Sequence, residues 1–359
     1  MGKIFVIDLK EGMITNEDIV TDSGVMVIPH GVALTQPIID HLIMLGIPEI
    51  DIDENASSGD NEAAEANDHK QERKVHFEEL RHEYDGVKDE LDNAFGNIVN
   101  GKLDKAEMDS VVNKCYDFFD SNNIGADVIN MLYSMHGYSD TTYMHCMNVG
   151  MISALIGTWL GWSEENVRLL NACGLFHDVG KLLVPKEIID KKGRLTEEEF
   201  AIMREHPANG YRLLKNSDMD EHILNAAIMH HERNDGSGYP FGLTEERIDP
   251  FAQIVAIADV YEAMTARRSY HEPICPFDVI AQFEEEGLTH FNTKYLLTFI
   301  QHIADAYLHS HVILNNGESA EIVLINKTRK SKPLVITTSG RPIDLARELD
   351  YTISSVETE

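Results

Sequence analysis

The sequence HHERNDGSGYP, residues 230–240, places two adjacent histidines shortly before a glycine-tyrosine-proline turn. A single histidine on such a segment is usually a satisfied core residue, but a pair invites a search for further ligands. The chain also carries His-Asp at residues 177–178, with more His and Asp residues on either side. Together these residues indicate a metal site, since clustered imidazoles and carboxylates are the usual metal ligands of proteins.

Seven candidate ligands share this imidazole or carboxylate chemistry: His145, His177, Asp178, His206, His230, His231 and Asp259. Asp259 lies in an apolar, helix-like run, where a buried carboxylate requires a cation or strong hydrogen-bond donors. The absence of a thiolate and the many nitrogens fit Fe, Mn or Zn better than Mg or Ca. Seven ligands exceed one tetrahedral site and favour two ions, which could share a hydroxide and clamp a phosphate.

Local sequence signals predict where these ligands lie. His177 and Asp178 close the apolar segment 169–176, and Lys181, a turn further on, offers a positive charge for a phosphate or leaving group. Thr196 and Glu199 form a capping box, so a helix is expected to begin there. This helix is expected to end at His206, where Pro207 breaks or bends the chain.

The overall composition restricts the classes of partner. The chain has 359 residues and a formal charge of -31, which disfavours a nucleic-acid polymer or an acidic membrane surface as partner. Its four cysteines are scattered, so neither a zinc ribbon nor a disulfide framework is indicated. No signal peptide is recognisable, and the apolar segment 149–162 is too short to span a bilayer. We therefore expect a cytoplasmic protein in which this segment is a buried core helix.

Hydrophobic periodicity predicts a mainly α protein with small β-containing parts at both ends. We expect a small α/β module over residues 1–53, with short strands and a helix ending at Gly46, and an acidic linker with amphipathic helices over 54–125. A helical domain follows over 126–310, and a β appendage with an Asn316-Gly317 hairpin over 311–359. An apolar stripe over residues 77–98 favours packing within the chain; the alternative is a dimerising helix that would make a homodimer.

Four motifs resemble the HD-GYP subgroup of the HD-domain phosphohydrolases: HDVGK at 177–181, EHPANG at 205–210, HHERNDGSGYPFGL at 230–243 and ADVYEAMTARRSY at 258–270. They occur in the family's order over roughly residues 125–310. The resemblance implies an HD-type helical bundle that hydrolyses cyclic di-GMP to pGpG, GMP or both, through a metal-bridging hydroxide at a bi- or trinuclear site. Residues 1–53 also resemble a small domain often found before HD-GYP domains.

Carried over residue by residue, the resemblance implies that one metal is held by His145, His177, Asp178 and Asp259. It implies that Asp178 bridges to a second metal, which His206 and His230 also hold, and that His231 matches a further ligand position. Catalytic roles fall to Asp178 and Lys181. Substrate-binding roles fall to Lys181, Gly238, Tyr239, Pro240 and Arg268. For Tyr239, contact with the ligand and simple packing of the loop onto the core are equally compatible with the sequence.

Two departures from the family pattern qualify these expectations. Trinuclear members carry a glutamate where this chain has Thr141, so we predict two divalent ions, Fe or Mn, with Zn as the alternative. His271 stands where the family often has Lys or Arg, which weakens one phosphate contact. The alternatives to a cyclic di-GMP phosphodiesterase are a phosphodiesterase for another cyclic dinucleotide and a non-catalytic cyclic-dinucleotide sensor. No motif identifies a regulatory protein partner.

Overall fold

The structure is a computed structural model with two compact units, Met1–His76 and Phe77–Glu359. It describes residues 2–6, 9–10, 12–16, 19–20, 26–28, 34, 38–39, 42, 47–53, 62–102, 105–121, 142–266 and 273–357, with the backbone alone at 2, 20, 26–27, 53, 62–80 and 121. The mainly α fold expected from the sequence is confirmed.

The first unit contains two small antiparallel sheets. One has the strand order β1-β5-β2, and the other pairs β3 with β4. Their strands are β1 (Gly2–Phe5), β2 (Ile14–Thr15), β3 (Ile19–Val20), β4 (Met26–Ile28) and β5 (Glu49–Asp53). In β5 the alternating sequence EIDID buries Ile50 and Ile52, as expected for a half-buried strand. Most of the helix predicted before Gly46 lies outside the described residues.

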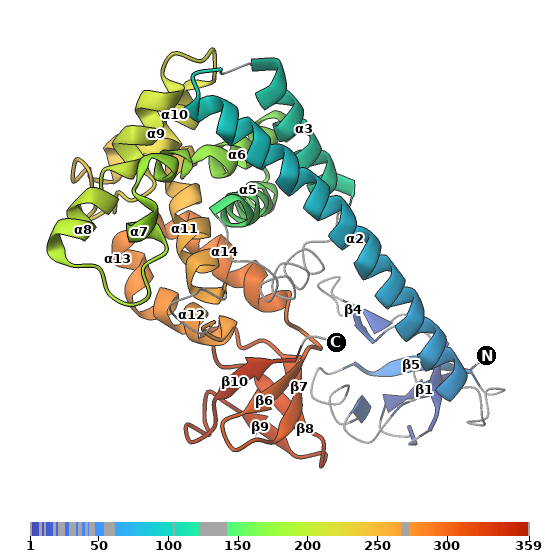
Figure 1. Ribbon diagram of the computed structural model, residues 1–359. Coiled ribbons are helices and arrows are strands. Elements are labelled where there is room, and N and C mark those ends of the chain that lie inside the picture. The colour runs from blue at the N-terminus through green and yellow to red at the C-terminus, as the bar shows by residue number, and fades with distance from the viewer. Residues whose placement is uncertain are drawn as a thin grey trace. The chain divides into compact units, whose positions relative to one another are not determined.

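The second unit is largely helical, and most of helix α2 belongs to it (Figure 1). The longer helices are α2 (Glu62–Val99), α3 (Lys105–Ser121), α5 (Thr142–Trp159), α6 (Glu164–Phe176), α9 (His206–Leu214), α10 (Glu221–Met229), α11 (Pro250–Thr265) and α14 (Thr293–Asp305). The shorter ones are η2 (Val179–Leu183), α7 (Lys186–Ile189), α8 (Glu197–Met203), η3 (Glu245–Arg247), α12 (Pro276–Gln282), the π-helical η4 (Phe283–Gly287) and α13 (Leu288–His290).

Helix α5 is the centre of this unit, and it packs against α6 and α11. Its residues from Met144 to Gly157 are buried on every side, as expected for the apolar segment 149–162. The approach to α6 depends on two glycines, because a Cβ at Gly174 would lie 2.5 Å from the Cα of Gly150. This close contact fixes the positions along the two helix axes at which α5 and the end of α6 meet. One metal-ligand candidate lies on α5, and another directly follows α6.

Helix α2 packs within the chain, as the stripe over residues 77–98 favoured. Tyr84, Val87, Leu91 and Phe95 are buried in the main core, and the Phe95 ring lies 5.8 Å from that of Phe176. The side chains of the first residues of the stripe lie outside the described part. Nothing in the described residues tests the homodimer.

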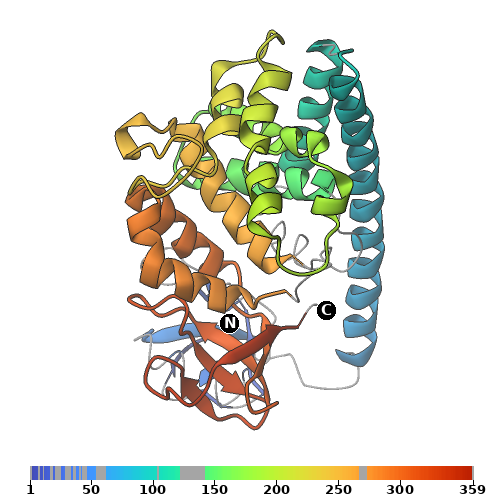
Figure 2. The same cartoon turned by 60° about the vertical axis from the view of Figure 1, so that its left-hand side comes forward.

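A five-stranded antiparallel sheet follows the helices, with the order β10-β6-β7-β8-β9. The strands are β6 (His311–Leu314), β7 (Ser319–Leu324), β8 (Leu334–Thr337), β9 (Pro342–Asp344) and β10 (Ile353–Val356). The predicted Asn316-Gly317 hairpin joins β6 to β7, and Gly317 adopts φ +84° as such a turn requires. Strand β10 packs against α12, at one end of the helical region (Figure 2).

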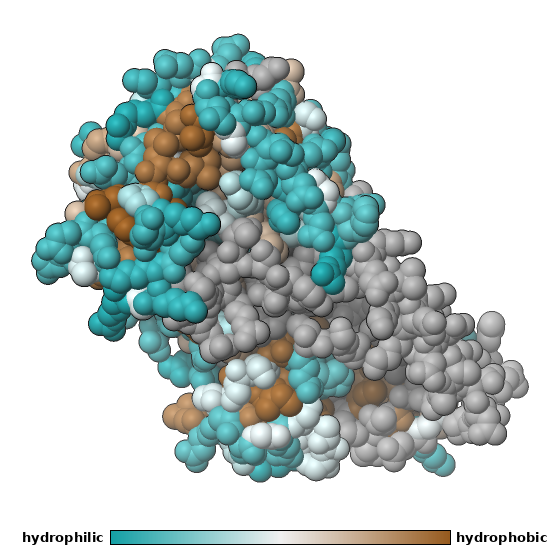
Figure 3. All heavy atoms as spheres, viewed as in Figure 1, coloured by the Kyte–Doolittle hydropathy of each residue, from teal (hydrophilic) through white to brown (hydrophobic). Residues whose placement is uncertain are grey.

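The described surface is largely hydrophilic, in line with the many charged residues of the chain. On the face seen in Figure 3, hydrophilic residues predominate among the described ones, and apolar residues form separate patches. Across the described parts of the chain, no helix combines the length and the apolar character that a bilayer crossing requires.

Candidate metal centre

The structure brings all seven predicted ligands together from five places in the helical unit. They are His145 on α5, His177 and Asp178 between α6 and η2, His206 at the start of α9, His230 and His231 after α10, and Asp259 on α11. Six of them are buried, and the His231 side chain is 20% exposed. Segments separated by more than a hundred residues thus converge on one point.

The predicted position of His206 was wrong in one respect. The capping box of Thr196 and Glu199 is present, but the helix it begins, α8, ends at Met203. His206 is instead the first residue of α9, and Pro207 is the second. Proline is favoured in the first turn of a helix because its missing N–H needs no partner there. Pro207 therefore helps a new helix to begin, where the sequence had suggested only a break.

Asp178 lies at the centre of the cluster, with a pair of imidazoles facing each of its oxygens. Its Oδ2 lies 3.3 Å from Nε2 of His145 and 3.4 Å from Nε2 of His177. Its Oδ1 lies 3.2 Å from Nε2 of His206 and 3.6 Å from Nε2 of His230. A carboxylate in this position can serve two ions, one through each oxygen.

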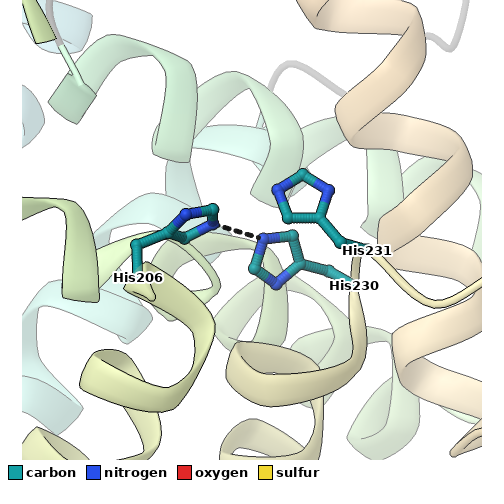
Figure 4. A group of neighbouring side chains, drawn as sticks. All are labelled: His206, His230 and His231. Atoms are coloured by element: carbon teal, nitrogen blue, oxygen red, sulfur yellow. Dashed lines mark hydrogen bonds between the residues drawn. The ribbon is translucent and has the colours of Figure 1, made fainter. Parts of the chain in front are cut away.

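The remaining ligands divide between these two sides. Asp259 joins the first side, with its Oδ1 3.1 Å from Nε2 of His145. His231 joins the second, where it forms a group with His206 and His230 whose ligand atoms all lie within 4.8 Å of one another (Figure 4). The figure shows the three rings converging, with Nε2 of His206 and His230 3.2 Å apart. The sequence had not assigned His231 to a side.

Four of the five histidines are oriented through Nδ1, which leaves Nε2 directed at the centre. An Nδ1–H that donates to an acceptor outside the site fixes both the tautomer and the ring orientation. The acceptors are the carbonyls of Gly174 for His177 (2.7 Å), Met203 for His206 (2.8 Å) and Ala226 for His230 (3.0 Å), and the Glu262 carboxylate for His145.

The donor set fits a pair of divalent metal ions. Nε2 of His177 and Oδ1 of Asp178 are buried and form no hydrogen bond within the described part of the chain. Buried polar atoms in native proteins nearly always have a partner, so these two, one on each side of the cluster, are placed as ligands for cations. Imidazoles and carboxylates without thiolates suit Fe, Mn and Zn.

The electrostatics keep Asp178, His230 and His231 in the protonation states that metal binding requires. Burial by itself would raise the pKa of Asp178, but the Lys181 ammonium and His177 hold that pKa well below its usual range. Burial lowers the pKa of His230 to about 4, and burial together with His230 lowers the pKa of His231 well below its usual value. At neutral pH Asp178 is therefore ionised, and His230 and His231 are neutral.

The loop that carries the GYP sequence is held close to the ligands. Gly236 adopts φ +78°, and a Cβ at Gly238 would lie 2.4 Å from the Glu232 Cα, so the turn needs both glycines. The Tyr239-Pro240 peptide bond is cis. The buried Glu232 carboxylate accepts the backbone N–H groups of Phe241 (2.7 Å) and Leu243 (2.9 Å). Glu232 directly follows the histidine pair, so these two hydrogen bonds hold the end of the loop close to the ligands.

Tyr239 packs on one of the metal-ligand candidates. Its ring stacks on the His231 imidazole, with centroids 4.6 Å apart and an interplanar angle of 29°, and the Arg204 guanidinium carbon lies 4.5 Å from the ring centre. Tyr239 thus packs against His231, in line with the interpretation that it holds the loop onto the core. Contact of its hydroxyl with a bound ligand stays a prediction. Arg204 was missed, although its place two residues before His206 could have suggested it.

The predicted phosphate-binding residues are divided between described and undescribed parts. Lys181 is paired with Oδ2 of Asp178, and its side chain is 25% exposed, so it lies beside the centre and also meets solvent. Arg268 lies outside the described residues, as do Thr141 and His271.

Glu262 is a further site residue that the sequence interpretation missed. It is buried on α11, one turn after Asp259, and it accepts the His145 hydrogen bond. A second carboxylate three residues after the first, on an otherwise apolar helix, is the pattern that could have revealed it.

Comparison with known proteins agrees with this geometry. Residues 128–294 match the HD domain family. The chain is 34% identical over 177 residues to the cyclic di-GMP phosphodiesterase PA4108 of Pseudomonas aeruginosa, which covers 49% of this chain and 42% of that protein. It is 38% identical over 132 residues to the 3'3'-cGAMP-specific phosphodiesterase 1 of Vibrio cholerae serotype O1, covering 37% of this chain and 31% of that protein.

A solved structure resembles the fold over most of the chain. Bd1817, an HDG"Y"P protein from Bdellovibrio bacteriovorus, superposes with a TM-score of 0.51 and 15% identity, covering 83% of this chain and 97% of that one. The fold and the ligand cluster therefore define a helical HD domain with a candidate metal centre. Residues 128–294 are thus similar to the HD domain family both in sequence and in the helical fold that carries the cluster. The chain spans less than half the length of the two curated relatives named above.

Proposed function

We propose that this chain is a metal-dependent phosphodiesterase that hydrolyses cyclic di-GMP to pGpG, GMP or both. The observation that carries the proposal is the position of Asp178, whose two carboxylate oxygens each face a pair of imidazoles. Such a bridging carboxylate is the central element of a binuclear site for phosphate chemistry. The similarity to phosphodiesterases of cyclic dinucleotides supports the same reaction class.

The proposed cofactors are two divalent ions, Fe or Mn, with Zn as the alternative. One would be held by His145, His177 and Asp259, the other by His206, His230 and His231, with Asp178 shared between them. When bound, two such ions supply a hydroxide at neutral pH and positive charge for phosphate oxygens. The neutral state of His230 and His231 favours this loading, because no proton has to leave either ring.

The protein's own groups would bind and orient the substrate around this centre. The formal charge of -31 repels an anionic dinucleotide, so cations placed at the site have to offset it locally. Lys181 provides an ammonium beside Asp178, where it can contact a phosphate oxygen or the leaving oxygen. Arg204, held over Tyr239, adds a second cation at the GYP loop. The predicted contact of Arg268 with a phosphate belongs to the same proposal.

A second candidate substrate is another cyclic dinucleotide, which the similarity to a 3'3'-cGAMP-specific enzyme favours. The residues described above would contact phosphate and metal, and none of them would distinguish guanine from adenine. A purely binding role would not require all seven ligands, so the complete set argues for catalysis.

Parallel assays of the two dinucleotides test this proposal. Full-length protein is purified anaerobically, stripped with a chelator, and reconstituted with Mn²⁺ or Fe²⁺. We expect linear products from cyclic di-GMP at a higher kcat/KM than from 3'3'-cGAMP. The reverse order would assign the second substrate, and tight binding of either dinucleotide without any turnover would make the protein a sensor.

A further inference from the structure

A buried chain of hydrogen bonds connects helix α2 to the metal-ligand candidate His145. The Tyr84 hydroxyl on α2 donates to Oδ1 of Asn148 at 2.6 Å, and Nδ2 of Asn148 donates to Oε1 of Glu262 at 3.1 Å. The other oxygen of Glu262 accepts from Nδ1 of His145, whose Nε2 faces Asp178 and Asp259. The four side chains that make up this relay are 1 to 3% exposed, so water hardly competes for these bonds.

Each link of the relay fixes the orientation of the next. Asn148 presents its oxygen to Tyr84 and its amide N–H to Glu262, and a reversed amide would turn its oxygen toward the Glu262 carboxylate and lose that bond. Glu262 accepts at both oxygens, so the two donors hold the carboxylate in one plane. The Nδ1–H of His145 then donates to a fixed acceptor, which directs Nε2 toward Asp178 and Asp259.

Burial strengthens the first link of this relay. Burial and the neighbouring Glu262 raise the pKa of Tyr84 well above its usual value, so the hydroxyl keeps its proton and remains a donor. The three helices that meet here are far apart in the sequence, since Tyr84 lies 64 residues before Asn148 and Asn148 lies 114 before Glu262. The relay is therefore a tertiary feature.

We propose that Tyr84, Asn148 and Glu262 are positioning residues for His145, and that α2 is thereby a functional part of the metal centre. Tyr84 lies outside residues 128–294, the part of the chain that matches the HD domain family. The inference rests on the proposed function, because it assumes that His145 holds a metal. It adds that the strength of this binding depends on a helix that supplies no ligand.

The competing explanation is that the relay only satisfies buried polar groups of the core. In that case, removing the Tyr84 hydroxyl would lower the stability of the fold and leave metal affinity unchanged. Residues that orient a metal ligand act differently, because substituting them typically lowers metal affinity by about 10- to 100-fold. Metal affinity therefore separates the two roles, without any measurement of turnover.

The test titrates Mn²⁺ into full-length, chelator-stripped protein and follows free Mn²⁺ by electron paramagnetic resonance. Glu262→Gln has only one acceptor for two donors, so we expect about 10- to 100-fold weaker binding at one of the two sites. Tyr84→Phe acts two residues further along the relay from His145, and we expect about a threefold loss there, a part of one hydrogen bond's contribution. Tyr307→Phe is the control, since it removes a buried hydroxyl that lies 3.1 Å from that of Tyr261, beside Glu262 on α11.

A double variant completes the experiment. If the effect of Tyr84 passes through Glu262, then Tyr84→Phe adds no further loss in the Glu262→Gln background, because coupled positions are not additive. The proposal is overturned if Tyr84→Phe loses thermal stability like Tyr307→Phe but binds Mn²⁺ as the parent does, or if the two losses of affinity simply add. A parent protein that binds no Mn²⁺ would instead overturn the proposed function, and this inference with it.

Discussion

Asp178→Asn tests the bridging role of the central carboxylate with the smallest change of shape. The amide has one oxygen in place of two, so one pair of imidazoles, either His145 with His177 or His206 with His230, would face an N–H₂ group. Its hydrogens would point at Nε2 atoms that are 3.2 to 3.6 Å from the carboxylate in the parent. A donor in that place repels a metal ion.

The magnitude follows from the loss of a direct oxygen ligand on one side and of the carboxylate's negative charge on both sides. Substitution of a group that merely supports a ligand lowers metal affinity by about 10- to 100-fold, so removal of the shared ligand should lower the affinity of at least one ion by more than about 100-fold. Lys181 also loses its carboxylate partner, but its ammonium meets solvent, so the loss of stability should stay below the value of about 3 to 5 kcal/mol for a fully buried pair. We therefore expect one metal or none per chain, a lower melting temperature and no detectable turnover.

The assay counts metal per chain by mass spectrometry after reconstitution and desalting, next to chemical denaturation of the same samples. Asp305→Asn on α14 is the matched control, because Asp305 accepts only from Gln301 among the described residues and is exposed. The control should keep the parent's metal content. If Asp178→Asn keeps two metals and the parent's rate, the bridging role assigned to this carboxylate is wrong.

Three further predictions concern the loop, the pH and the metal itself. Gly238→Ala would place a methyl group 2.4 Å from the Glu232 Cα, so we expect the free energy of unfolding to fall by about 1 to 3 kcal/mol and His231-dependent metal binding to be lost. The control is Gly86→Ala, in open space on α2, which should stabilise the fold by up to about 1 kcal/mol. Urea denaturation measures both changes in stability. In chelated protein the pKa of His230 is about 4 in the folded state, below its ordinary value of 6.5. The contribution of neutral His230 to the free energy of unfolding is therefore complete above pH 6.5, and about 3 kcal/mol of that free energy is lost as the pH falls to 4. A loss that is equally steep in His230→Gln would refute this assignment. Chelation should also lower the melting temperature, since metal at 100 times its Kd stabilises by about 2.7 kcal/mol, and an unchanged melting temperature would mean that no metal is bound.

Much of the metal centre could be predicted from the sequence because its ligands sit in short, local signals. The His177-Asp178 pair, the His230-His231 pair and the apolar run around Asp259 are each recognisable alone, and the structure brings them together as expected. The α5 core helix followed from its apolar composition in the same way.

The features that were missed depend on contacts between distant segments. No local pattern shows that Tyr84 meets Asn148, or that Glu262 meets His145, because these pairs form only after α2, α5 and α11 have packed. The position of His206 was wrong for a local reason, since Pro207 is compatible with both the end and the first turn of a helix. The contact of Arg204 with Tyr239 likewise requires the GYP loop to fold back over α8.

The most direct test of the central claim is a single-turnover reaction of cyclic di-GMP with protein that carries two Mn²⁺ per chain. The account predicts pGpG, GMP or both from the parent protein and none from Asp178→Asn. Parent protein that holds both metals and binds the dinucleotide, but leaves every cyclic dinucleotide intact, would contradict it.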